Sequence, residues 1–90
     1  MITQNDYNIL IAITDKDDKS KGIIPSNGTT KKEIVDKTQL SSTKVNNTIR
    51  LFLTKGYIKE ALSVGNSKSY ILTKEGIKLH IESKGGVFND

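Results

Sequence analysis

The stretch Thr29–Glu60, TTKKEIVDKTQLSSTKVNNTIRLFLTKGYIKE, predicts two helices joined by a short turn. The first of these helices begins at Thr30, because Thr30 and Glu33 have the spacing of a capping box. In that motif each of the two side chains bonds the backbone of the other residue. The helix is expected to end near Thr38, just before the turn.

The second helix of the stretch follows the turn directly. Ser41 or Ser42 is the expected N-cap, since a serine hydroxyl accepts a hydrogen bond from the first free amides of a helix. The helix is expected to run to Lys55. Gly56 then takes the position after the last helical residue, where the backbone turns left-handed at no steric cost.

The second helix has two different faces. Its apolar residues lie at positions i, i+4, i+7 and i+8 and are expected to pack inward: Val45, Ile49, Phe52 and Leu53. The opposite face is polar and is expected to read bases or phosphates in a major groove: Thr43, Lys44, Asn46, Asn47 and Arg50. No acidic residue lies between Ser41 and Lys59, which favours a polyanionic partner.

After Gly56 the apolar period changes from that of a helix to that of a strand. Residues 57–62 and 68–72 predict a β-hairpin around the turn sequence VGNS. Thr73 is the expected cap of a final helix over residues 74–83.

A helix is also expected before the stretch Thr29–Glu60. It runs from Thr3 to Asp15, with Thr3 as N-cap and Asp6 at the third helical position. A charged loop follows it. Within that loop Ile23 and Ile24 are expected either to pack against the domain or to form a very short strand.

The order of elements is therefore helix, helix, helix, strand, strand, helix. Two helices around a tight turn, followed by a hairpin, are the arrangement of a winged helix-turn-helix, an α+β fold. Ninety residues make one domain. We expect this domain to span residues 1–84 and to be followed by a flexible tail at 85–90.

The charge of the chain is uneven. The net charge is +4, but residues 1–25 hold three lysines and four aspartates, whereas residues 26–90 hold eleven basic and six acidic residues. A basic excess on one part of a small domain favours nucleic acid as the partner.

Further candidate DNA contacts lie at helix starts and in the hairpin turn. Free amides and the positive end of the helix dipole favour a phosphate at a helix start, where we expect contacts from Thr30, Lys31, Ser41 and Ser42. Lys32 occupies a similar position beside Lys31. The hairpin turn is small, polar and free of acid, and its expected contacts are Gly65, Asn66, Ser67 and Lys68.

The sequence does not point to an enzyme. It has no cysteine, no phosphate-binding loop and no nucleophile motif, and its single histidine, His80, is expected to be a packed or surface residue of a helix. We expect no cofactor and no metal. The apolar run Ile9–Ile13 is too short for a signal or membrane segment, so no membrane partner and a cytoplasmic location are expected.

The stretch Thr29–Glu60 and the later segment GNSKSYILTKEGIKL (residues 65–79) resemble the winged helix-turn-helix domains of MarR-like regulators. The shared features are an "EI" helix start, an "LS-x-x-x-V" entry to the second helix, a "GYI" exit and a "Y-x-LT-x-x-G" return. The resemblance covers about residues 29–81 and implies the fold.

The same region is similar in layout to TubR-type centromere-binding adaptors of plasmid and phage partition systems. That resemblance implies a homodimer on repeated DNA sites, a tubulin-like GTPase filament as partner, and repression of its own operon. It places residues 41–44, Asn46 and Asn47 on the recognition helix, and residues 65–68 in the wing.

Three alternatives stay open beside the partition adaptor. One is a MarR-like transcriptional repressor. A second is a winged-helix protein-interaction module without DNA binding, which would capture its partner independently of salt. A third is an RNA or single-strand binder, which the basic face disfavours because it lacks aromatic residues for base stacking. Tyr57 and Tyr70 lie in the predicted strands, where we expect them to be packing residues.

Overall fold

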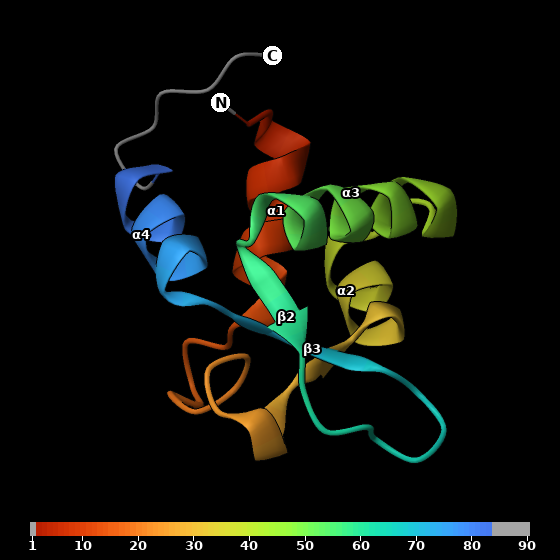
Figure 1. The fold of residues 1–90 in the computed structure, drawn as a ribbon. Coiled ribbons are helices and arrows are strands. Elements are labelled where there is room, and N and C mark those ends of the chain that lie inside the picture. Colours follow the sequence, from red (N-terminus) through yellow and green to blue (C-terminus); the bar gives the residue numbers. More distant parts are fainter. Residues whose placement is uncertain (1, 84–90) are drawn as a thin grey trace.

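The computed structural model describes residues 2–83, so the expected tail at 85–90 and the expected boundary at 84 lie outside the described residues. Its elements follow the predicted order, with one short strand and one short 3-10 helix added: α1 (Gln4–Ile13), η1 (Pro25–Asn27), β1 (Thr29–Thr30), α2 (Lys31–Thr38), α3 (Ser42–Lys55), β2 (Ile58–Glu60), β3 (Ser69–Leu72) and α4 (Lys74–Ser83). Figure 1 shows α1 between α4 on one side and α2 and α3 on the other.

The predicted helix starts and the glycine after α3 are confirmed, whereas the predicted end of the first helix at Asp15 is wrong, because Thr14 is already extended and α1 ends at Ile13. Thr3 and Asp6 form the capping box of α1, and Thr30 and Glu33 form that of α2. Gly56 follows α3 with a φ of 77°, in the left-handed region. These ends depend on residues three or four positions apart, and the sequence therefore shows them directly.

The sheet has three antiparallel strands in the order β1-β3-β2. The strand that joins the two predicted hairpin strands is β1, at Thr29–Thr30. The prediction of a very short strand near residues 23–24 is therefore wrong. The amides of Ile23 and Ile24 both bond the carbonyl of Ser20, which makes a turn and leaves no ladder to join. Thr29 is fully buried and pairs with Tyr70 instead.

The core lies where α1, α2 and α3 meet the sheet. Its fully buried large side chains come from all three helices and from β2: Ile9, Leu10, Ile13, Ile34, Val45, Phe52 and Ile58. One predicted inward residue is wrong, because Leu53 is 37% exposed while Thr48 is only 3% exposed. The inner face of α3 is therefore centred between Val45 and Phe52, about one residue away from the predicted stripe.

The last helix begins beside the residue that precedes β2, because the amide of Thr73 donates to the carbonyl of Tyr57 at 3.0 Å. The hydroxyl of Thr73 accepts from the amide of Gly76, as the predicted cap requires. His80 stacks on the ring of Tyr7 in α1, with ring centroids 6.0 Å apart. Ile81 is exposed rather than packed. Within residues 2–83 no helix combines the length and apolar character that a membrane crossing requires.

Substitution of Gly76 by alanine should destabilise the domain, although alanine normally favours a helix. A Cβ at this position would lie 1.9 Å from the carbonyl oxygen of Tyr57, a backbone atom that cannot move aside cheaply. We expect Gly76→Ala to lower the free energy of unfolding by about 1–3 kcal/mol in urea denaturation. Lys78→Ala, on the exposed side of α4, is the control and should stay within about 0.5 kcal/mol. Equal stability of both variants would contradict the close approach.

Candidate nucleic-acid interface

The two helices of the predicted helix-turn-helix are separated by three residues. Thr38 ends α2, and Gln39 takes a left-handed conformation with a φ of 61°. Ser41 caps α3, its hydroxyl accepting from the amide of Lys44 at 3.0 Å. The turn thus redirects the chain sharply and lays α3 across α1 and α2 (Figure 1).

The predicted outer face of α3 does point away from the body. Thr43, Asn47 and Arg50 are exposed, and Asn46 is half-buried. The inner face holds the buried residues Val45, Thr48, Ile49 and Phe52. Ser41 and Ser42 at the start of the helix are exposed as well. Because α3 contains no acidic residue, this outer face carries donors and positive charge without a carboxylate of its own.

Lys44 differs from the other residues predicted to contact DNA. Its Nζ atom lies 3.0 Å from a carboxylate oxygen of Asp6 in α1, and its side chain is only 39% exposed. Thr48 donates to the same oxygen at 3.3 Å. Asp6 itself is 7% exposed. The structure therefore gives Lys44 a place in the anchor between α3 and α1, which the sequence did not reveal.

The electrostatics of Asp6 follow from this anchor. Burial by itself raises the pKa of a carboxyl group, but hydrogen bonds from Lys44, Thr3 and Thr48 and the positive charge of Lys44 outweigh burial and lower the pKa of Asp6. Asp6 is therefore ionised in the folded protein at neutral pH, and its negative charge offsets the positive charge of Lys44.

The wing, residues 61–68, connects β2 to β3. Gly65 has a φ of 60°, and Val64 and Ser67 form a single β-bridge that closes the tip. Gly65, Asn66, Ser67 and Lys68 are all exposed. Lys68 lies 3.5 Å from Glu60 at the end of β2, with both side chains more than half exposed. The wing tip has no acid of its own, but this neighbouring strand supplies one.

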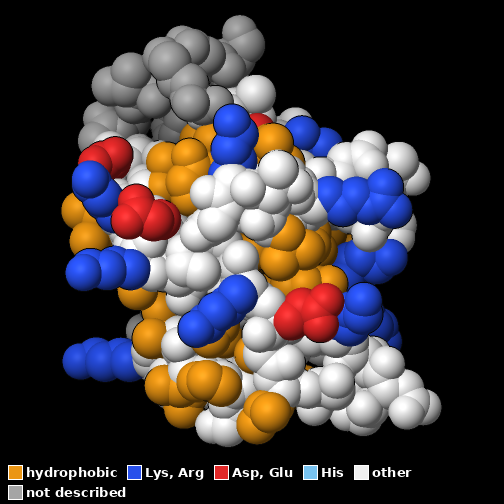
Figure 2. Space-filling model, viewed as in Figure 1, with side chains coloured by type: hydrophobic (Ala, Val, Ile, Leu, Met, Phe, Trp, Pro, Cys, Tyr) orange, Lys and Arg blue, Asp and Glu red, His pale blue; other side chains and the backbone are white. Residues whose placement is uncertain are grey.

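A groove of about 380 Å³ brings the start of α2, the outer face of α3 and the wing together. Its walls contain five of the predicted contacts and two further residues: Thr30, Lys31, Asn46, Ser67 and Lys68, with Lys32 and Tyr70. Figure 2 shows Lys and Arg side chains along the side of the molecule where Figure 1 places α3, α2 and the wing. Tyr70 is the member that sequence reasoning missed, since a tyrosine in a strand was interpreted as a packing residue.

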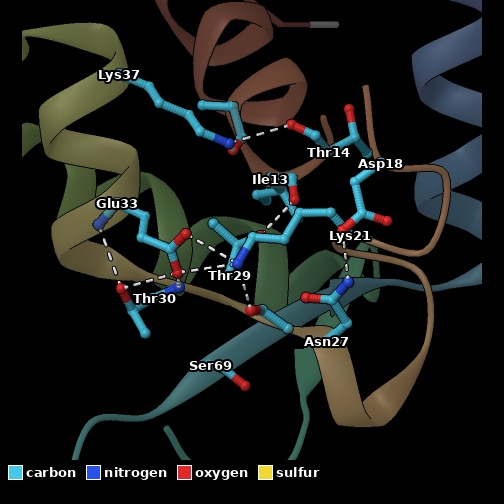
Figure 3. Close-up of polar contacts among 12 residues, drawn as sticks. Ile13, Thr14, Asp18, Lys21, Asn27, Thr29, Thr30, Glu33, Lys37 and Ser69 are labelled. Carbon is cyan, nitrogen blue, oxygen red and sulfur yellow. Dashed lines mark hydrogen bonds and ion pairs between the residues drawn. The ribbon is translucent and has the colours of Figure 1, made fainter. Parts of the chain in front are cut away.

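The only acidic side chain in the first turn of α2 is Glu33, and it is paired inside the molecule. Lys21, from the loop after α1, lies 2.8 Å from Glu33 and also donates to the carbonyl of Gly28 at 3.0 Å. Figure 3 shows Lys21 between the loop and α2, on the inner side of the capping box. Lys31 and Lys32 are consequently left as exposed charges at the groove, with no ion pair among residues 2–83.

A larger hollow, of about 700 Å³, lies between α1, the end of α2 and α4, away from these residues. Tyr7, Ile11, Lys37 and His80 contribute to its walls. None of the residues predicted to contact DNA lines it. In the described part of the chain, no three His, Cys, Asp or Glu residues gather as a metal site would require.

Replacing Asp6 by asparagine tests the anchor of α3. The lowered pKa means that Asp6 contributes stability fully above its ordinary value of 3.8, and that this stability is lost as the pH falls through the lower pKa of the folded state. We expect Asp6→Asn to lose about 1–3 kcal/mol of unfolding free energy at neutral pH, measured by urea denaturation. The difference in unfolding free energy between Asp6→Asn and the unmodified protein should disappear in acid. Asp17→Asn, at an exposed loop position, is the control and should not lose comparable stability. A loss of stability in Asp6→Asn that does not depend on pH would refute the ionic anchor between α1 and α3.

No family model and no curated protein matches the sequence. Solved structures do match. MepR, a transcription regulator of the Staphylococcus aureus multidrug efflux pump MepA, has a TM-score of 0.74 and 23% identity over 93% of this chain and 56% of its own. BpsR of Bordetella bronchiseptica has a TM-score of 0.72 and 17% identity over 93% of this chain and 53% of its own.

The type III plasmid segregation protein TubR also matches, with a TM-score of 0.71 and 25% identity over 96% of this chain and 79% of its own. The chain thus spans little more than half the length of MepR and BpsR and a larger share of TubR. One of the matching MepR structures is a complex with DNA. The helix-turn-helix, the three-stranded sheet and these similarities together show that the chain has the MarR-like winged helix-turn-helix fold.

Proposed function

We propose that this protein binds double-stranded DNA as a homodimer, without catalytic activity of its own, and acts as a centromere-binding adaptor of a plasmid or phage partition system that also represses its own operon. The observation that carries DNA binding is the outer face of α3. It exposes Thr43, Asn47 and Arg50, has no acidic residue, and continues through Asn46 into a groove with three lysines.

The chemistry of that face suits a duplex. Asparagine side chains can pair with the edge of adenine in a major groove, and arginine can bond guanine or a phosphate. Ser41 and Ser42 sit at the positive end of the α3 dipole, which favours a phosphate. Lys31, Lys32 and Lys68 line one groove beside α3 and would contact the DNA backbone there. The shared groove of Asn46 and the three lysines supports a helix inserted in a DNA groove with the backbone beside it.

The homodimer and the partition role rest on separate support. Apolar side chains remain exposed on α1 and α4, away from α3, and offer a second copy a surface: Ile11 at 40%, Ile77 at 37% and Ile81 at 65%. The wing sequence resembles that of TubR-type adaptors, and TubR is among the structures with the same fold. A tubulin-like GTPase filament is the protein partner that this role implies.

A MarR-like transcriptional repressor is the second candidate. The similarity to MepR and BpsR favours it. The two roles use the same DNA-binding surface and differ in the arrangement of DNA sites.

Arg50→Ala should weaken duplex binding about tenfold without changing the unfolding transition, because Arg50 is exposed and makes no contact that the core needs. Fluorescence anisotropy over a series of salt concentrations measures it. Lys78→Ala removes the same charge from α4 and is the matched control, with binding expected to be unchanged. If both variants bind like the unmodified protein, α3 does not face the DNA.

Footprinting on the DNA upstream of its own gene separates the candidate roles. A row of evenly spaced protected repeats is expected for a partition adaptor, whereas one protected palindrome would identify a repressor. No protection at any salt concentration, together with salt-independent capture of a protein, would instead favour the interaction module.

A further inference from the structure

Tyr70 has its ring in the core and its polar end at the groove. The residue is 9% exposed and belongs to the central apolar cluster. It lies in β3, directly opposite Thr29 of β1 and Glu60 of β2. It also contributes to the wall of the groove between α2 and the wing. The residue is therefore held by the core and by the sheet, and it also reaches the groove.

The hydroxyl of Tyr70 makes no hydrogen bond to any other residue between 2 and 83. In this part of the chain, no polar side-chain atom that is sealed from solvent lacks a partner, so this hydroxyl reaches the groove surface. Tyrosine hydroxyls on buried rings usually have a partner. Because this hydroxyl has no partner among residues 2–83, it is available to donate to a ligand in the groove.

The charges around this hydroxyl indicate what it recognises. Lys31 and Lys32 at the start of α2 and Lys68 of the wing are the charged residues of the groove wall, and no carboxylate lines it. Of the two acids nearby, Glu33 pairs with Lys21, which does not line the groove, whereas Glu60 pairs with Lys68 of the groove wall at 3.5 Å. The second pair is exposed on both sides and therefore weak, so an anion of higher charge density can replace Glu60.

We propose that this groove is a phosphate site, in which the Tyr70 hydroxyl donates to one backbone phosphate of duplex DNA while Lys31, Lys32 and Lys68 surround it. The proposal rests on the proposed DNA binding. Asn46 connects the two surfaces, since it lies both on α3 and in the groove wall. A strand whose bases meet α3 thus passes its backbone over this groove, between α2 and the wing.

Tyr70→Phe removes the hydroxyl and leaves the ring that packs the core. We expect about a tenfold loss of duplex affinity, the usual scale for a lost hydrogen bond to a charged group. The salt dependence of binding should keep its slope, because the lost donor is neutral and releases no counterion. Lys32→Ala should lower affinity and also reduce the slope by about one unit. A merely structural effect of Tyr70→Phe would displace Lys68 and alter the slope as well.

Tyr57→Phe is the matched control, because Tyr57 packs edge-on against Phe52 and does not line the groove. Its affinity should equal that of the unmodified protein. Unfolding in urea checks that all three variants keep their stability. If Tyr70→Phe binds duplex like Tyr57→Phe while Arg50→Ala is impaired, the groove proposal is overturned and the proposed function stands.

Two probes identify the source of the phosphate. A duplex in which single phosphates are replaced in turn by uncharged methylphosphonate should lose affinity at one position, and at that position Tyr70→Phe should cause no further loss. Inorganic phosphate, titrated in NMR, should shift the amides of Lys31, Lys32 and Lys68 only at much higher concentration than duplex. Saturation by inorganic phosphate at the concentrations where duplex binds would instead assign the groove to the free anion. If no duplex binds at all, the proposed function fails, and the phosphate titration alone then decides whether the groove takes the anion.

Discussion

The carboxylate of Asp6 connects α1 to α3 by accepting from the Nζ atom of Lys44 and the hydroxyl of Thr48. Lys44 and Thr48 directly precede Val45 and Ile49, two buried apolar residues of α3. Apolar packing brings the helices together but leaves their relative rotation loosely defined, whereas a directional bond to a nearly buried carboxylate defines it. The outer face of α3, the groove beside it and the position of the wing all depend on that rotation.

The features that the sequence revealed are local ones. The caps at Thr3, Thr30 and Ser41 and the glycine after α3 follow from residues a few positions apart, and the structure contains all of them. Periodicity likewise located the hairpin and α4. The face of α3 was predicted to within one residue, the difference being that Thr48 is buried and Leu53 is not. A polar residue on an inner face cannot be recognised until its partner is known.

The features that the sequence concealed depend on distant pairings. The Asp6 partner of Lys44 lies 38 positions away, and β1 has only two residues, too few for an apolar period to be visible. Tyr70 was interpreted as a packing residue, which is correct for its ring and incomplete for its hydroxyl. Lys44 and Tyr70 thus each contribute both to the interior and to the outer surface, and a single sequence displays only one of these roles.

The base of the wing is attached on every side. Leu72 donates to the carbonyl of Gly22, Thr73 donates to that of Tyr57, and β1 and β2 flank β3. Beyond Ala61 the wing residues are all exposed until Ser69. Any bending of the hairpin is therefore confined to its outer end, and mutations there leave the core and the helix-turn-helix undisturbed. Such a division allows the sequence of the tip to change without loss of stability in the rest of the domain.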